Sequence, residues 1–134
     1  MSDTMTRLWP ALSFENADRM TDWLLAIGFT THQIYRTDDD KPGQVGSVTH
    51  AELVWPGGGG IMFGTHDPGN ELAGRPGQAS IYLVTDDVPA ALRRAVDAGA
   101  TVVRDVVEEP YGGQAATVRD PEGNTWTFGQ YQPA

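Results

Sequence analysis

Apolar residues recur along this chain in two arrangements that follow one another twice in the same order. In the first half, an apolar stretch over 7–14 precedes a group of apolar residues at helical spacing. Residues three and four positions apart share one helix face, so this pattern predicts a strand followed by an amphipathic helix. The helix residues are Ala17, Met20, Trp23, Leu24 and Ile27. Asn16 is suited to cap the helix through its side-chain oxygen, and Gly28 suits its C-terminal end.

Three further strands are predicted in the first half of the chain. Loose alternation of apolar and polar residues indicates strands over 29–36 and 45–55, separated by the polar loop TDDDKPGQ. The four glycines at 57–60 then predict a turn into a last strand over 61–64. The predicted order of elements is therefore βαβββ.

The second half of the chain repeats this order. A strand over 80–85 precedes either Asp86 or Asp87, each of which is suited to cap a helix. The helix carries an apolar stripe and is predicted to end at Gly99; the stripe consists of Val88, Leu92, Ala95 and Val96. Strands over 101–107, 115–119 and 125–131 follow.

An internal repeat relates the two halves. The segments AELVWPGGGGIMFG (51–64) and ATVRDPEGNTWTFG (116–129) align without a gap and share five of fourteen residues. Such a repeat indicates two copies of one structural unit, with a functional cavity between them or across a dimer. We therefore expect one domain over 1–134, with module one over about 6–64, a Gly-rich and Pro-rich linker over about 65–78, and module two over about 79–131.

Composition narrows the classes of partner. A chain of 134 residues fits one domain, and the lack of cysteine excludes disulfides and thiol chemistry. The net charge of −9 argues against nucleic acid or an anionic membrane as the main partner. We find neither a signal peptide nor a membrane span in the sequence, and we expect a cytoplasmic protein.

Two motifs in this arrangement resemble the vicinal oxygen chelate superfamily, which includes glyoxalase I, extradiol dioxygenases and bleomycin-resistance proteins. The motifs are the terminal RDPEGN running into TWTFG (119–129) and the helix end LLAIGF (24–29). The resemblance implies an α+β fold in which two βαβββ modules form a cup-shaped mixed sheet, with the helices outside. It also implies modules paired across a homodimer. The DPEG segment itself is predicted to form a structural turn.

The resemblance further implies four metal-ligand positions, two in each module. In this chain they fall on Leu8 or Trp9 and on Met62 in module one, and on Ser80 and Thr127 in module two. Divalent metals bind imidazoles and carboxylates in such sites. Because none of these residues is a competent ligand, we expect no metal and no other cofactor.

His50 and Glu52 are the candidate polar residues of the cavity. Residues two apart in a strand share a face. If Leu53 packs beneath the helix, as its repeat partner Val118 suggests, then His50 and Glu52 face the cavity; otherwise they form a surface pair on the rim. His32 and His66 are interpreted as residues of a strand edge or surface and of the linker, without a role in the site.

Aromatic residues supply the other candidate binding surface, because indole and phenol rings stack on planar or cationic ligands. Tyr82 shares the face of Ser80, whereas Trp126 is equally compatible with the core and with the cavity. The predicted ligand-binding residues are Trp9, His50, Glu52, Trp55, Met62, Ser80, Tyr82, Tyr111 and Thr127.

Three functions are compatible with these features. The leading hypothesis is a metal-independent protein that sequesters a drug-like or natural-product antibiotic, whether flat and aromatic or cationic, and so confers resistance by binding. The alternative is a lyase, isomerase or dioxygenase of the superfamily that uses His50 and Glu52 as acid and base or as relocated metal ligands. The third is a scaffold or regulatory dimer that retains a vestigial cup.

Overall fold

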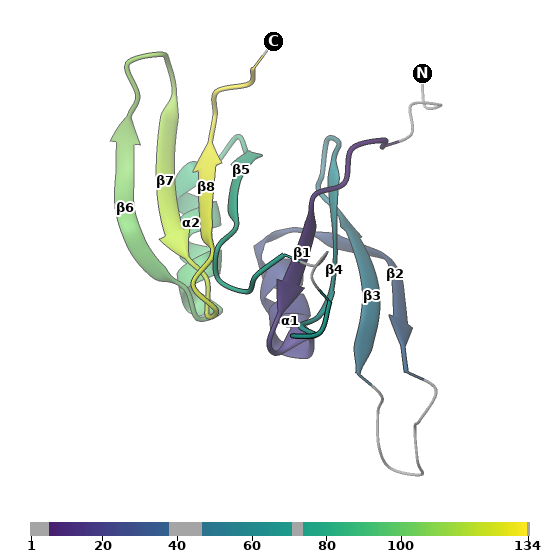
Figure 1. Ribbon diagram of the computed structural model, residues 1–134. Helices are drawn as coiled ribbons and strands as arrows, with labels where there is room; N and C mark the ends of the chain where they lie inside the picture. Colours follow the sequence, from purple (N-terminus) through teal and green to yellow (C-terminus); the bar gives the residue numbers. More distant parts are fainter. Residues whose placement is uncertain (1–5, 38–46, 71–73, 134) are drawn as a thin grey trace. The chain divides into compact units, whose positions relative to one another are not determined.

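The computed structural model describes residues 6–37, 47–70 and 74–133. The chain divides into two compact units, which we call unit 1 (residues 1–75) and unit 2 (residues 76–134). Each unit has one helix and one four-stranded sheet (Figure 1). The two βαβββ modules of the α+β fold are thus confirmed.

Unit 1 contains β1 (Ala11–Phe14), α1 (Ala17–Ile27), β2 (Thr30–Arg36), β3 (Val48–Val54) and β4 (Gly60–Thr65). Its strands lie in the order β1-β4-β3-β2. β1 runs parallel to β4, and the other neighbouring strands are antiparallel. The sheet is therefore mixed, and β4 lies inside it although it is the last strand of unit 1.

Unit 2 contains β5 (Ser80–Val84), α2 (Val88–Asp97), β6 (Thr101–Glu108), β7 (Gln114–Arg119) and β8 (Thr125–Gly129). The order β5-β8-β7-β6 repeats that of unit 1. β5 is parallel to β8, and the remaining pairs are antiparallel. The internal repeat in the sequence corresponds to two copies of the same topology.

Side-chain caps set the start of both helices. Asn16 accepts a hydrogen bond from the backbone N–H of Arg19 at 3.0 Å, and Asp87 accepts one from Ala90 at 3.0 Å. Of the two aspartates considered, Asp87 is the cap. Gly28 and Gly99 follow the helices with positive φ angles of 129° and 122°, which only glycine adopts readily.

Within its own unit, each sheet packs one face against the helix, and no described helix or strand of that unit covers the other face, which we call the open face. In unit 1 the apolar side chains of the covered face are fully or almost fully buried, and they are Leu12, Phe14, Leu53, Ile61 and Phe63. In unit 2 the corresponding set is Leu83, Val118, Trp126 and Phe128. Leu53 and Val118 are both fully buried, as the repeat predicts. Trp126 belongs to this covered face and donates from Nε1 to Asp120, so it is a core residue.

Some boundaries differ from those predicted. β1 begins at Ala11, although the Pro10 carbonyl already accepts a 2.9 Å hydrogen bond from the backbone of Met62 in β4, and β8 ends at Gly129. Of the predicted loop at 37–44, only Thr37 lies within the described residues. Neither helix in the described part of the chain is long and apolar enough to cross a membrane.

Candidate functional site

The open face of the unit 1 sheet carries polar side chains from β2 and β3 next to Met62 of β4. Strand register pairs Glu52 of β3 with Gln33 of β2 on one side and with Met62 of β4 on the other. His50 pairs with Tyr35 in the same way. Because side chains opposite one another in a sheet share a face, these residues lie together on the face away from α1.

A hydrogen bond joins the two candidate polar residues. His50 Nε2 lies 2.7 Å from Glu52 Oε2. Since an ionised carboxylate only accepts hydrogen bonds, the imidazole is the donor. The Glu52 side chain is 25% exposed and that of His50 is 38% exposed, so the pair is shielded from solvent without being sealed off.

His32 extends this pair to three residues. Its Nε2 lies 3.8 Å from the other carboxylate oxygen of Glu52, Oε1. The register of β2 shifts between Thr31, which pairs with Leu53, and Gln33, which pairs with Glu52, so His32 occupies a β-bulge. The spacing of residues in β2 does not indicate this bulge, and from the sequence alone His32 is predicted to lie at a strand edge or surface.

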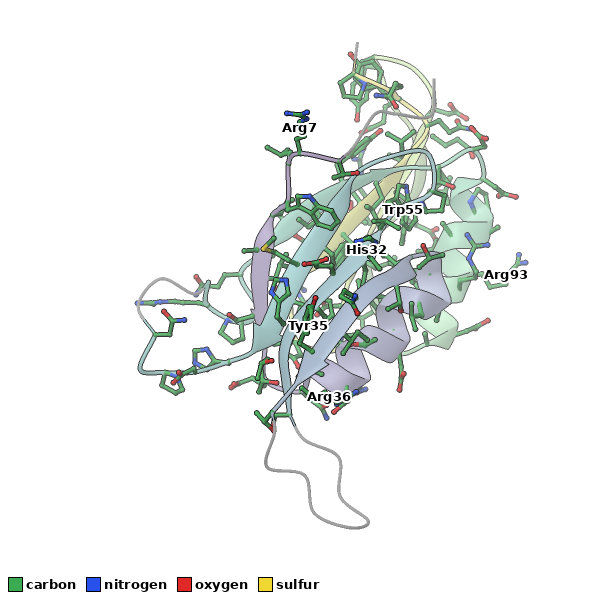
Figure 2. The ribbon with its side chains drawn as sticks, turned by 90° about the vertical axis from the view of Figure 1, so that its right-hand side faces the viewer. Arg7, His32, Tyr35, Arg36, Trp55 and Arg93 are labelled. Carbon is green, nitrogen blue, oxygen red and sulfur yellow. The ribbon has the colours of Figure 1, made fainter. Side chains whose placement is uncertain are left out.

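Aromatic rings flank the two imidazoles. The ring centroids of Trp9 and His32 are 6.5 Å apart, and those of Tyr35 and His50 are 6.0 Å apart. Figure 2 shows His32 and Tyr35 on the strands of unit 1, with α1 behind them. We define the Glu52 cluster as Trp9, His32, Tyr35, His50, Glu52 and Met62.

Trp55, another predicted site residue, has different neighbours. Its ring packs against Phe29, with ring centroids 4.9 Å apart, and it lies beside Gly28. Both neighbours follow directly after α1. The structure therefore places Trp55 at the C-terminal end of this helix and outside the Glu52 cluster.

Unit 2 places three of the predicted residues on its own open face. Tyr82 pairs with Thr127, and Thr127 shares a 2.8 Å hydrogen bond with Thr117 between their hydroxyl groups. Ser80 is exposed at the start of β5. The Tyr82 hydroxyl donates to the Tyr131 carbonyl at 2.8 Å. Burial is the main cause that raises the pKa of Tyr82 above 10.0.

Tyr111 belongs to a paired polar network in the same unit. Arg104 donates to both oxygens of Glu109, at 3.2 and 2.8 Å, and the Tyr111 hydroxyl donates to Glu109 Oε2 at 2.6 Å. Tyr111 also packs edge to face on Tyr131. The Arg104 hydrogen bond, followed by that of Tyr111, lowers the pKa of Glu109, and the bond to Glu109 raises the pKa of Tyr111. We call these residues the Glu109 network.

The repeat allows the two open faces to be compared position by position. β6 has the same register shift, between Val102 and Arg104, so that Val103 occupies the bulge where unit 1 has His32. At the sequence offset of 65, Ala115 corresponds to His50 and Thr117 corresponds to Glu52. The imidazole and carboxylate groups are thus specific to unit 1.

The chemistry that this arrangement permits is hydrogen bonding, charge pairing and ring stacking. Among the described residues, no group of three or more His, Asp or Glu side chains is arranged to hold a metal ion. Glu52 and His50 are close enough to exchange a proton with each other or with a bound molecule.

Comparison with known proteins gives one family match and several relatives. Residues 80–129 match the family described as the glyoxalase At5g48480-like C-terminal domain. An uncharacterized protein of Mycobacterium bovis is 34% identical over 102 residues, which are 66% of this chain and 62% of the relative. A Mycobacterium tuberculosis protein is equally similar, over 56% of its length. The chain therefore spans about three fifths of the curated relatives it matches.

Solved structures match almost the whole chain. TioX from Micromonospora sp. ML1 is 26% identical, with a TM-score of 0.68 over 96% of this chain and 98% of its own. A bleomycin-binding protein complexed with bleomycin is 18% identical, with a TM-score of 0.62 over 96% and 100%. A glyoxalase family protein from Bacillus cereus is 16% identical, with a TM-score of 0.70 over 96% and 97%. All three share the fold described above.

Proposed function

We propose that this chain, a member of the glyoxalase/bleomycin resistance/dioxygenase (vicinal oxygen chelate) superfamily, is a metal-independent protein that binds and sequesters a small molecule. The ligand is a drug-like compound or natural-product antibiotic, and binding it confers resistance. Such a protein needs no nucleophile and no metal, only apolar ring surfaces with a few well-placed polar groups.

The Glu52 cluster is the observation that carries this proposal. It combines a single partly shielded carboxylate with two imidazoles and with the rings of Trp9 and Tyr35. Rings of this kind provide a large contact area at a small cost in conformational entropy, and the carboxylate fixes the orientation of a ligand. The repeat-related positions of unit 2 have neither group, so the cluster is not a general requirement of the fold.

The comparisons support ligand binding as one use of this fold. One protein with the same fold is complexed with bleomycin. At 18% identity, this likeness concerns the fold, and the argument for binding by this chain rests on its own residues. In our proposal, Ser80, Tyr82, Tyr111 and Thr127 are further ligand contacts of unit 2, and the chain acts as a homodimer.

Metal analysis and a thermal-shift screen test the proposal together. The purified protein is analysed for bound metals and is then heated with a panel of antibiotics and flat aromatic compounds. A ligand stabilises the folded state by RT ln(1 + [L]/Kd), so a compound at one hundred times its Kd adds about 2.7 kcal/mol. We expect at least one compound to raise the Tm, with and without EDTA. Tightly bound stoichiometric metal, or a panel without a single hit, would contradict the proposal.

Matched variants locate the binding site. Trp9→Ala and Glu52→Gln are expected to weaken binding of any hit, whereas Asp22→Asn, a change on the exposed side of α1, should leave it unchanged. The Tm of each unliganded variant shows whether it is folded. Unchanged affinity in both cluster variants would remove the cluster from the site.

Enzymatic activity is the second candidate, and the His50–Glu52 contact favours it. At 2.7 Å, the carboxylate is hydrogen-bonded to the imidazole and can orient it as a general base. Mass spectrometry of a ligand recovered after incubation separates the two functions. An unchanged ligand supports sequestration, whereas conversion that is lost in His50→Gln and Glu52→Gln supports an enzyme.

A further inference from the structure

We infer that the Glu52 cluster selects ligands that carry a cationic N–H group on a planar aromatic ring system, and that His32 is a further residue of this site. The cationic group binds at Oε1 of Glu52. The inference rests on the proposed function and specifies its ligand class: a protonated amine or amidine attached to, or part of, a flat ring.

The two oxygens of Glu52 differ in how they are paired. Oε2 accepts the 2.7 Å hydrogen bond from His50. Oε1 faces His32 at 3.8 Å, which is too long for a hydrogen bond, and no described residue donates to it. An ionised carboxylate has about four acceptor positions. The side chain is 25% exposed, so a donor from outside can approach this carboxylate.

The charges near Glu52 favour a cation. In the described part of the chain, Glu52 forms no ion pair with an arginine or lysine, and the ionisable side chains next to it are the two histidines. Arg36, on the neighbouring strand, pairs with Asp18 at 2.7 Å. Glu52 therefore presents a carboxylate without a permanent counter-charge. A bound cation would supply that charge in a partly desolvated setting, where charge-assisted hydrogen bonds are strong.

The β-bulge in β2 brings His32 to this carboxylate. A bulge puts two residues of one strand opposite one residue of its partner, and so it changes the direction of a side chain. The same register shift occurs in β6, where Val103 is the extra residue. The bulge is therefore a feature of the repeated unit. An imidazole at this position is found only in unit 1. We therefore assign His32 as a positioning residue that borders the open oxygen of Glu52 and limits the directions from which a ligand can approach it.

Trp9 provides the surface for the planar part of the ligand. Its ring lies close to His32, with ring centroids 6.5 Å apart and an interplanar angle of 41°. An indole face attracts both aromatic rings and cations, with Trp the strongest of the aromatic residues for cations. A flat cation can therefore stack on Trp9 while its N–H group approaches Glu52.

Two dyes with the same three-ring framework test this inference. 9-Aminoacridine is protonated at neutral pH, whereas acridone is neutral, and both fluoresce. Fluorescence titration of the full chain with each dye in the presence of EDTA gives two Kd values. We expect the cation to bind about tenfold or more tightly than the neutral dye, as a hydrogen bond to a charged group implies.

Four variants assign the selectivity to residues. Glu52→Gln should bring the ratio of the two Kd values close to one, and His32→Ala should reduce it by about threefold, since its partner is at long range. Glu108→Gln, a charge-matched change on β6, and Thr31→Ala, at the β2 position that pairs with Leu53, should leave it unchanged. A ratio of affinities does not respond to a uniform loss of stability, and circular dichroism shows that each variant is folded.

The results distinguish this inference from the proposed function. Equal binding of both dyes, or a ratio that Glu52→Gln leaves unchanged, overturns the inference and leaves small-molecule binding in place. If His32→Ala leaves the ratio of the two Kd values unchanged, His32 is not a positioning residue of this site. If 9-aminoacridine does not bind at all, the inference fails, and the wider thermal-shift screen decides whether the proposed function fails with it.

Discussion

The six-membered ring of Trp9 lies directly over Gly60, the first residue of β4. A methyl group built on the Gly60 Cα overlaps ring atoms of Trp9 and lies 2.9 Å from the carbonyl oxygen of Leu53. The Trp9 indole also donates from Nε1 to the Thr6 carbonyl at 3.2 Å. The absence of a side chain at Gly60 thus permits the placement of a ring in the Glu52 cluster.

Gly60→Ala should therefore destabilise the protein and weaken ligand binding. We expect the free energy of unfolding to fall by about 1–3 kcal/mol, as in other overpacked sites, because neither the ring nor the Leu53 carbonyl can move freely. Urea unfolding measures this change. Gly69→Ala is the control, since its added Cβ meets only the Asp67 carboxylate at 3.4 Å. Equal stability of the two variants would show that the contact between Trp9 and Gly60 is unimportant.

Asp120 is predicted to be the most sensitive polar residue of unit 2. Its buried carboxylate accepts hydrogen bonds from the backbone of Glu122 and Asn124, from the Asn124 amide and from Trp126 Nε1, at 2.7–3.1 Å. Asp120→Ala leaves these donors without their partner, and a buried unsatisfied group costs about 1–3 kcal/mol. We expect a loss of about 3 kcal/mol or more in urea unfolding. Asp22→Asn, on the exposed side of α1, should change little, and a similarly small loss in Asp120→Ala would contradict this prediction.

Glu109 should make the stability depend on pH in the acid range. Hydrogen bonds from Arg104 and then Tyr111 lower its pKa below the usual 4.5. A carboxylate with a lowered pKa contributes stability above its unfolded pKa, and this contribution is lost as the pH falls through the folded value. The difference in unfolding free energy between the wild type and Glu109→Gln should therefore be largest at neutral pH and shrink below about pH 4.5. A difference that is independent of pH would contradict this assignment.

The helices could be predicted from the sequence because their signals are local. The apolar stripe from Ala17 to Ile27, the Asn16 cap and Gly28 all lie within one short segment, and each acts through neighbouring backbone groups. The shared face of His50 and Glu52 followed from the period of a strand. The repeat also indicated which side chains of the strand face the helix, because Leu53 and Val118 are equivalent core residues.

His32 and the Glu109 network could not be predicted in the same way. The position of His32 depends on a register shift against β3, and strand pairing is not encoded in the spacing of β2 alone. The hydrogen bonds among Arg104, Glu109 and Tyr111 depend on how the β6–β7 hairpin closes. Trp55 lies next to a strand, but its ring packs at the end of α1 because Gly28 and Phe29 leave a surface for it there.

Removal of metals should not affect the protein. The positions at which the resemblance to the superfamily predicts metal ligands hold Met62, Ser80, Thr127 and either Leu8 or Trp9, all of which lack the imidazole or carboxylate groups that such metals bind. After dialysis against EDTA, we expect the Tm and the affinity for 9-aminoacridine to be unchanged. A fall in Tm that is restored by adding back one divalent metal would show that a metal belongs to the native state.

The most direct test of the proposed site is a map of ligand-induced chemical shifts. In a ¹⁵N-labelled sample titrated with 9-aminoacridine, the largest shifts in unit 1 should occur at the amides of His32, His50 and Glu52 and at the indole N–H of Trp9. These groups surround the carboxylate that is predicted to bind the cation. Largest shifts on the exposed side of α1 or α2, with the Glu52 cluster unperturbed, would contradict a binding site on the open face of unit 1.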